Sequence, residues 1–448
     1  MLTGAHGAGG LHPPALPWSP LFQGDAAEAV RSAAEETLEA LLDWPRRENP
    51  GLPGGHAGLA LVCGYGAQVL GDARLRDRSQ EFLNLAVAGI AAQPTLPALH
   101  GGFSGVAWVR AHLNRQTAAS PDDRGYEEID ATLARSIDLS PPESNYDLIG
   151  GLAGLGLYAL ERGADSGARP VLDRVVVRLV TMAEPRPDGV TWLTPPHLLP
   201  EHQRTQTPLG CYNLGLAHGI PGILVVLARA GAAGALDDRG CEVLERGVQW
   251  LLAQQQTFAN GTRFPHLIPR GFEDRQSGSR VAWCYGDLGI AAALVVAGKC
   301  HDRADWVSAA LDIARSAATI PEEKSGVLDH GFCHGSVGNA HLFHRIYRAT
   351  GDAALAGAAR SWFAQLLRTR QNLGIGGFVS WRARNPTGVG AAAMDYAHLP
   401  DPSLLTGSAG VVAGLLAANS DVEPEWDRCF AVSAVRDENR PNVGGSAH

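Results

Sequence analysis

Two kinds of helical segment alternate along this chain. Segments of the first kind place apolar residues at helical spacing and charged residues on the remaining face, as outer, solvated helices do. They are Ala26–Leu42, Arg78–Ala92, Tyr126–Ile137, Pro170–Ala183, Cys241–Gln256, Ala304–Ala317 and Ala353–Arg370. Segments of the second kind, such as Gly219–Ala228, are apolar on nearly every side, which is typical of buried helices. The alternation predicts an all-α fold built from helix pairs.

Each of the seven apolar segments opens with a Gly-x-x-Gly signature. The glycines are Gly55/Gly58, Gly102/Gly105, Gly151/Gly154, Gly219/Gly222, Gly286/Gly289, Gly335/Gly338 and Gly407/Gly410. Consecutive signatures lie 47 to 72 residues apart, which accommodates two helices and a loop, so they mark an internal repeat. Glycine allows close backbone approach at these positions, and the helix N-termini are expected to face one mouth of the assembly.

Helix pairs of this kind stack either as an open solenoid or as a closed α/α toroid. An open solenoid needs polar caps on its terminal repeats. Here the first and last inner segments, Gly58–Leu70 and Gly410–Ala418, are as apolar as the others. The sequence therefore predicts a closed α/α toroid of seven inner and seven outer helices, forming one domain over residues 1–418.

Three longer stretches, rich in Pro, Gly, Thr and aromatic residues, interrupt the repeat at about 189–213, 257–282 and 372–405. All three precede inner segments, so we expect them to overhang the mouth, with a short hairpin near Gly376–Trp381. Residues 419–448 lack helical periodicity and are expected to form an irregular C-terminal tail.

Composition and charge narrow the class of protein. The formal net charge is −9 and the basic residues are scattered, which argues against a nucleic-acid partner. Seven cysteines without a CxxC pair are typical of a reducing compartment. Residues Met1–Trp18 lack the regions of a signal peptide, and no uncharged apolar run reaches membrane-spanning length. We therefore expect a soluble, cytoplasmic protein without an integral membrane segment. The scarcity of lysine suggests a G+C-rich bacterial genome.

Cysteine and histidine side chains gather at one register of the repeat. Cys284 and Cys333 each lie two residues before the first glycine of a signature, and His334 follows Cys333. Zinc binds cysteine and histidine, and catalytic zinc sites keep three protein ligands and one open position. The shared register predicts that Cys284, Cys333 and His334 bind one zinc ion per chain. The alternative is two buried structural thiols with a hydrogen-bonded histidine.

A further histidine, His218, occupies in the fourth repeat the position that His334 occupies in the sixth. An imidazole beside the metal is suited to proton transfer near neutral pH. Arg280, on the loop before Cys284, is placed to stabilise a developing anion. Tyr285 shares the histidine register, and Asp147 lies on the loop before the third inner segment. For Arg280, Tyr285 and Asp147 a structural role stays equally open.

His100 shares the register of the two cysteines but belongs to the second repeat. That repeat is distant from the fifth and sixth around a ring, so His100 is left outside the predicted site.

Four motifs together resemble the signatures of the lanthionine synthetase C-like family. They are Asn145-Tyr146-Asp147, Leu216-Ala217-His218-Gly219-Ile220-Pro221-Gly222, Ala282-Trp283-Cys284-Tyr285-Gly286-Asp287 and Cys333-His334-Gly335-Ser336-Val337-Gly338. The resemblance covers essentially the whole chain and implies an α/α toroid with zinc at its mouth. It also implies the metal ligands Cys284, Cys333 and His334, the acid/base residue His218, and the further active-site residues Asp147, Arg280 and Tyr285. Family members often carry a small β-rich insertion, which here only the long loops could supply.

The resemblance further implies a substrate, a ribosomal precursor peptide already dehydrated at Ser or Thr. Its cysteine thiolates would add to dehydroalanine or dehydrobutyrine and close lanthionine or methyllanthionine rings. A cognate dehydratase and a peptide transporter are the implied partners, in a biosynthetic complex associated with a membrane.

Three other functions compete with this interpretation. An enzyme that adds a glutathione-type thiol to dehydrated residues would use the same site. A non-catalytic zinc-containing peptide scaffold is the second, although the intact His218 and ligands favour an enzyme. A prenyltransferase-like enzyme would be expected to have a carboxylate ligand and a basic diphosphate pocket, which the sequence does not indicate.

Overall fold

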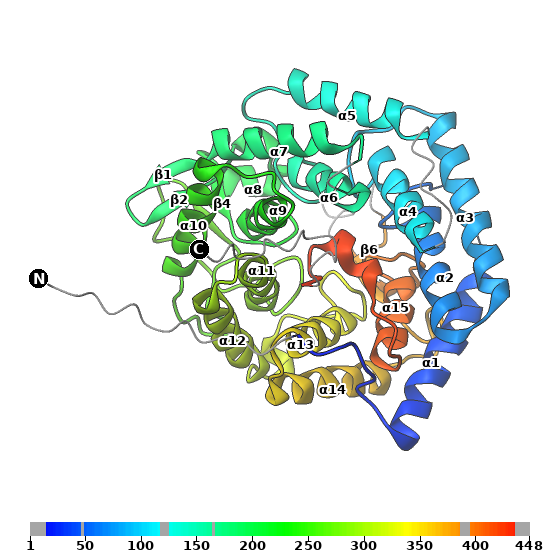
Figure 1. Ribbon diagram of the computed structural model, residues 1–448. Coiled ribbons are helices and arrows are strands. Elements are labelled where there is room, and N and C mark those ends of the chain that lie inside the picture. The colour runs from blue at the N-terminus through cyan, green and yellow to red at the C-terminus, as the bar shows by residue number, and fades with distance from the viewer. Residues whose placement is uncertain (1–14, 46–48, 117–124, 164–165, 386–394, 435–448) are drawn as a thin grey trace, which may run out of the picture.

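The protein is a ring of helices with an inner and an outer layer (Figure 1). The computed structural model describes residues 15–45, 49–116, 125–163, 166–385 and 395–434. The inner helices are α2 (His56–Leu70), α4 (Phe103–Arg115), α6 (Leu152–Arg162), α9 (Ile220–Ala232), α11 (Asp287–Cys300), α13 (Ser336–Thr350) and α15 (Ser408–Ala418). The outer helices are α1 (Gly24–Leu42), α3 (Ala73–Ala92), α5 (Glu127–Leu139), α7 (Arg169–Met182), α10 (Asp238–Ala253), α12 (Ala304–Ala318) and α14 (Ala353–Arg368). The predicted α/α toroid is confirmed.

The ring is closed by the two ends of the described chain. Each inner helix contacts the next, and the last, α15, contacts the first, α2. Helix α1 packs against α15, so the final helix pair combines an N-terminal and a C-terminal element. Trp18 Nε1 donates to the Ala417 carbonyl at 2.9 Å, and the Leu21 amide donates to the Ala418 carbonyl at 2.8 Å. These bonds fasten the N-terminal segment to the end of the last inner helix.

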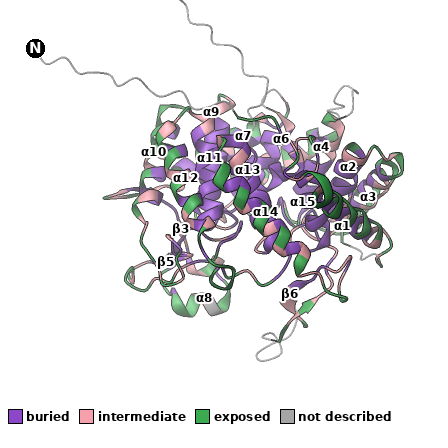
Figure 2. Ribbon diagram, turned by 90° about the horizontal axis from the view of Figure 1, so that it is seen from below, coloured by how far each residue is buried: buried purple, intermediate pink, exposed green. Residues whose placement is uncertain are grey.

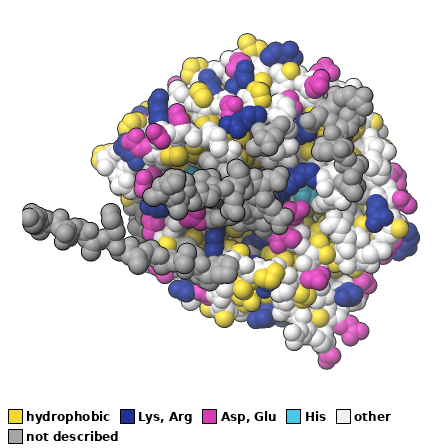
Figure 3. Space-filling model, viewed as in Figure 1, with side chains coloured by type: hydrophobic (Ala, Val, Ile, Leu, Met, Phe, Trp, Pro, Cys, Tyr) yellow, Lys and Arg dark blue, Asp and Glu magenta, His cyan; other side chains and the backbone are white. Residues whose placement is uncertain are grey.

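The apolar character of the inner helices follows from their burial. Every one of the 11 residues of α15 is buried, whereas the 16-residue α10 buries one face. Because the outer helices and the interior of the ring cover the inner helices, a polar side chain there needs a partner within the protein, as His341 and Arg345 of α13 have. On the face viewed in Figure 3, the described basic and acidic side chains are interspersed. Among the described residues, no helix has the length and apolarity needed to cross a membrane.

The Gly-x-x-Gly signature is required by a close approach of main chain to main chain. A Cβ atom on the second glycine would lie only 1.9–2.6 Å from the carbonyl oxygen six residues earlier in all seven signatures. Real Cβ atoms do not approach closer than 3.0 Å. At Gly105, for example, the oxygen of Leu99 would be 1.9 Å away. The glycines therefore let each loop fold tightly over the start of its inner helix.

Backbone hydrogen bonds join neighbouring loops around the mouth, mostly between residues two positions before the first glycine of each signature. We call them the hydrogen-bond ring. Its bonds run from the amide of Ala217 to the carbonyl of Cys284 (3.4 Å), Cys284 to Cys333 (3.1 Å), Cys333 to Leu405 (2.8 Å), Leu405 to Pro53 (3.0 Å), His100 to Ile149 (3.0 Å) and Leu148 to Ala217 (3.0 Å). The step from Pro53 to His100 has no such bond in the described chain, because proline lacks an N–H.

Short β-structures lie at one face of the ring, the mouth (Figure 2). They are the antiparallel sheet β3 (Leu193–Thr194), β4 (Cys211–Asn213) and β5 (Leu267–Pro269), and the hairpin β6 (Ser380–Ala383) and β7 (Tyr396–Leu399). A further hairpin, β1 (Glu184–Arg186) and β2 (Gly189–Thr191), packs against the outer helix α10. A short helix, α8 (Glu201–Gln206), lies beside the sheet. The expected hairpin near 376–381 forms slightly later, at 380–399, and residues 386–394 lie outside the described part. The β-structure thus comes from the long loops.

The chain after residue 418 differs from the irregular tail that we expected. Residues Glu425–Phe430 form the 3₁₀-helix η5, and residues 426–433 are buried. We call residues 425–433 the central hub, because they lie inside the ring of inner helices (Figure 1). The sequence predicted that the domain ends at 418, whereas residues 426–433 are buried within the ring; residues 435–448 lie outside the described part. The signal was missed because six residues are too short to show helical periodicity.

Two adjacent charges of the hub bind opposite walls of the ring. Arg345 Nη2 on α13 donates to Asp427 Oδ1 at 2.9 Å, and His341 Nε2 lies 2.6 Å from Asp427 Oδ2. Arg428 Nη1 lies 3.5 Å from Glu161 Oε2 on α6. All of these side chains are almost fully buried. The hub is thereby held by ion pairs from two sides.

We predict that Asp427→Ala lowers the free energy of unfolding by about 3–5 kcal/mol, the usual cost of leaving a buried charge unpaired. Asp421→Ala, which removes an exposed carboxylate just before the hub, is the matched control and should change stability little. Denaturant-induced unfolding monitored by circular dichroism measures both. Equal unfolding midpoints for the two variants would contradict the role given to the hub.

Candidate functional site

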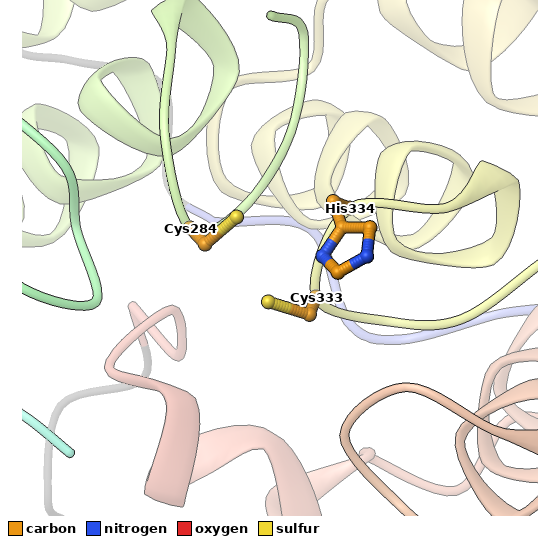
Figure 4. A group of neighbouring side chains, drawn as sticks. All are labelled: Cys284, Cys333 and His334. Atoms are coloured by element: carbon orange, nitrogen blue, oxygen red, sulfur yellow. The ribbon is translucent and has the colours of Figure 1, made fainter. Parts of the chain in front are cut away.

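The predicted metal ligands lie together at the mouth. The ligand atoms of Cys284, Cys333 and His334 all lie within 4.8 Å of one another (Figure 4). The hydrogen-bond ring explains this proximity, because the amide of Cys284 donates to the carbonyl of Cys333. Both cysteines are free thiols. In the described part of the chain no fourth Cys, His, Asp or Glu joins this group. Two thiols and one imidazole match the donors of a zinc site with an open position.

The two thiols differ in their proton affinity. A hydrogen bond from the Cys333 thiol outweighs burial and lowers the pKa of Cys284 well below its ordinary value. His334 and Arg280 lower it further. The same bond and burial raise the pKa of Cys333. Cys284 is therefore the first of the pair to become a thiolate, which is the form that binds metals.

A buried carboxylate that the sequence analysis missed lies behind the histidine ligand. Asp329 Oδ2 is 3.5 Å from His334 Nε2, and the Asp329 side chain is 1% exposed. Its Oδ1 accepts from the Gly331 amide at 3.2 Å, and its Oδ2 accepts from the Trp381 amide of β6 at 3.0 Å. A carboxylate in this position orients a metal-binding imidazole. Asp329 thus links the β6–β7 hairpin to the metal ligands.

His218 and Asp147 form a pair across two repeats. His218 Nδ1 lies 2.7 Å from Asp147 Oδ2, and Asp147 Oδ1 accepts from the Gly150 amide at 2.7 Å. The Asp147 side chain is 10% exposed, whereas that of His218 is 43% exposed and reaches solvent. Burial lowers the pKa of His218, but the hydrogen bond and charge of Asp147, with a contribution from Cys284, raise it above the ordinary 6.5. His218 is therefore protonated more readily than an ordinary histidine, and within the described part of the chain its second nitrogen has no hydrogen-bond partner.

Tyr285 packs between two histidines at the mouth. Its ring stacks near His218 with centroids 6.2 Å apart, and His266 meets its edge at 6.5 Å. Asn213 Nδ2 donates to the Tyr285 hydroxyl at 3.1 Å. Burial raises the pKa of Tyr285 to about 12, so it is a neutral phenol. His266 and Asn213 were missed, and their only signal was the expectation that loops 189–213 and 257–282 overhang the mouth.

Arg280 departs from a pattern that five of the other six repeats share. In five repeats the residue six positions before the first glycine is Asn or Asp, and its Oδ1 accepts from the amide two residues later at 2.9–3.2 Å. Arg280 holds this position in the fifth repeat and cannot form that turn. It is exposed, and among the described residues it has no hydrogen-bond or ion-pair partner. A free cation where the fold elsewhere uses a turn residue favours a role in the site.

His100 shares the register of the two cysteines in the repeat, but in the structure it contacts the central hub and lies apart from the metal-binding group. Its Nε2 lies 3.2 Å from the Cys429 carbonyl of the central hub, and it does not belong to the metal-binding group. Burial lowers the pKa of His100 to about 4, so it is neutral. Its exclusion from the predicted metal ligands agrees with this geometry.

Known proteins resemble this chain in both sequence and fold. Residues 48–431 match the family model described as "Lanthionine synthetase C-like protein". The nisin biosynthesis protein NisC of Lactococcus lactis subsp. lactis is 27% identical over 269 residues, which cover 54% of this chain and 60% of that protein. The match thus spans less than two thirds of the relative's length. A solved nisin cyclase structure superposes with a TM-score of 0.68 at 17% identity, over 92% of this chain and 98% of the other. This likeness shows a shared fold.

We predict that Asp147→Asn lowers the pKa of His218, because the variant loses the carboxylate charge that opposes burial. In the wild-type protein the pKa should lie above 6.5, and in the variant it should lie lower. Nuclear magnetic resonance titration of ¹³C-labelled histidine measures the change. Asp138→Asn, which removes an exposed carboxylate paired with Arg174 on the outer layer, should leave the titration of His218 unaltered. An unchanged pKa in Asp147→Asn would rule out this pairing in solution.

Proposed function

The chain belongs to the lanthionine synthetase C-like family, and on that premise we propose that it closes lanthionine and methyllanthionine rings in a dehydrated precursor peptide. The observation that carries the proposal is a Cys₂His cluster and a His–Asp pair on neighbouring loops of one mouth. The donors of Cys284, Cys333 and His334 fit zinc. Zinc held by them would offer an open position to a peptide cysteine and favour its thiolate.

The chain's own residues supply the proton chemistry. When the thiolate adds to the β-carbon of a dehydrated residue, a carbon–sulfur bond forms and the double-bond electrons move to an enolate. The α-carbon then needs a proton, and His218 delivers it from the nitrogen that faces away from Asp147. Asp147 raises the pKa of His218 through its charge and its 2.7 Å hydrogen bond, which favours the protonated form that the step requires. The proton that left the thiol restores the imidazolium, so the reaction is balanced without another reagent.

Arg280 and Tyr285 assist this proton transfer. Arg280 is exposed and its charge already acts on Cys284, so we assign it to the enolate oxygen. Tyr285 holds the His218 ring in place by stacking and stays neutral. Together with His218 and Asp147, these are the residues that we propose for catalysis.

The chemistry of the substrate also defines the partners. A dehydratase must supply the dehydrated peptide, and a transporter would export the cyclised product from the bacterial cytoplasm. Addition of a glutathione-type thiol would use the same residues and is the second candidate. A scaffold without catalysis is less well supported, because the His218–Asp147 pair has no need to be charged in a scaffold.

We predict about one zinc ion per chain in the purified protein. Cys284→Ala and Cys333→Ala should each lose the metal, because two protein ligands hold zinc far more weakly than three. Cys241→Ala, at an exposed thiol outside the cluster, is the control and should keep it. Metal analysis by mass spectrometry measures the content. Folded wild-type protein that binds no zinc when zinc is supplied would remove this part of the proposal.

The second prediction concerns the product. A dehydrated precursor incubated with the protein should give predominantly one lanthionine diastereomer, because His218 protonates a bound enolate from one side. His218→Asn should keep its zinc and cyclise roughly 10²–10⁴-fold more slowly. Chiral chromatography of the hydrolysed product measures the configuration, with millimolar glutathione present as a competing thiol.

The possible outcomes separate the candidate functions. Predominant glutathione adducts would favour intermolecular thiol transfer. A diastereomer mixture identical to the enzyme-free control would favour the scaffold. A His218→Asn variant that cyclises at the wild-type rate would show that another group supplies the proton.

A further inference from the structure

The central hub reaches the two segments that carry the cysteine ligands. Phe430, which is fully buried, has its ring centroid 4.3 Å from that of Phe332 and 5.3 Å from that of Trp283. Phe332 and Trp283 are the residues immediately before Cys333 and Cys284. Trp283 Nε1 also donates to the Phe430 carbonyl at 2.9 Å. One hub residue therefore contacts the main-chain neighbours of both ligands, which come from different repeats.

The hub is also held by contacts outside these two segments. The Cys429 carbonyl lies 3.2 Å from His100 Nε2, on the loop of the second repeat. Asp427 is bound by Arg345 and His341 on α13, and Arg428 is bound by Glu161 on α6. Immediately after Phe430 the chain turns, with Ala431 in the left-handed region at φ 61°. Phe430 is thus fixed relative to the whole ring and not only to the ligands.

Two kinds of contact hold the segments that carry Cys284 and Cys333, one along the ring and one from its centre. The hydrogen bond from the Cys284 amide to the Cys333 carbonyl links the segments along the ring. Contact with Phe430 supports both from the centre of the ring, on the residue before each cysteine. Only one rotatable bond, Cα–Cβ, lies between the main chain and the sulfur of a cysteine, so the position of the sulfur follows the main chain closely.

We propose that Phe430 is a positioning residue for the metal site, which sets the separation of the Cys284 and Cys333 sulfurs by supporting Trp283 and Phe332. The inference rests on the proposed zinc site and extends it to the C-terminal hub. In this arrangement the segment after residue 418 completes the site without supplying a ligand. Loss of outer support of a metal site usually weakens metal binding by about 10–100-fold.

The test compares two identical substitutions at equally buried phenylalanines. Phe430→Leu removes the support, whereas Phe363→Leu alters a fully buried ring of the outer helix α14 that packs against Phe22. Zinc affinity is measured on the full-length protein by competition with a chromophoric chelator. The visible spectrum of the cobalt(II)-substituted protein reports the arrangement of the ligands, and thermal unfolding reports stability.

We expect Phe430→Leu to bind zinc about 10–100-fold more weakly and to shift the cobalt bands, whereas Phe363→Leu keeps wild-type affinity and spectrum. If both variants lose stability but keep wild-type zinc affinity and cobalt spectrum, Phe430 is a packing residue only and the inference is overturned.

A second variant covers the case in which Phe430→Leu does not fold. Trp283→Phe keeps an aromatic ring but removes the donor to the Phe430 carbonyl. It should also weaken zinc binding and shift the cobalt bands, and wild-type values would overturn the inference. A wild-type protein that binds no zinc would instead contradict the proposed function. A wild-type protein that binds zinc without cyclising peptide leaves the positioning test valid.

Discussion

The site depends on the main-chain hydrogen bonds that join neighbouring repeats at the mouth. These bonds bring residues of equal register side by side although they lie far apart in the chain, as the 3.1 Å bond from Cys284 to Cys333 shows. They form only because the loops approach the inner helices so closely that a Cβ atom at either end of the signature would collide with main chain. The glycines therefore do more than permit packing. They allow the loops of neighbouring repeats to approach, so that residues at the same register of the repeat become neighbours in space. Two thiols and two imidazoles thereby lie at one mouth.

Two groups at the mouth have pKa shifts that favour opposite charges, negative at Cys284 and positive at His218. Hydrogen bonding from Cys333 lowers the pKa of Cys284 and favours a thiolate, while Asp147 raises the pKa of His218 and favours an imidazolium. Each charge favours the other, because Cys284 also raises the pKa of His218. In the reaction that we propose, the thiolate that is consumed comes from the peptide, and His218 supplies the proton to the neighbouring carbon. Asp147 acts on His218 from a loop of the third repeat, so the raised pKa of His218 does not depend on Cys284 alone.

The central hub joins the inner helices at the centre of the ring, where its apolar residues belong to the same hydrophobic core as theirs. Its charges bind α13 and α6, and its carbonyls accept from His100 and Trp283, so one short segment connects most of the repeats. Buried ion pairs gain little over apolar packing but cost several kcal/mol when one partner is removed. They therefore specify where the segment lies more than they add stability. In the arrangement that we infer, this specificity extends to the ligands through Phe430.

The sequence by itself determined the helix pairs, the closure of the ring and the proximity of Cys284, Cys333 and His334. It could do so because helical periodicity is local, and because a repeat converts equal register into equal position. The roles of these residues and the identity of the metal stay predictions. Only the tertiary structure placed Asp329 behind His334 and His266 beside Tyr285, since loop conformation is not periodic. Only it revealed the hub, whose partners lie 82 and 267 residues away along the chain. Charges at such separations meet through folding alone, and no local pattern in the sequence marks them.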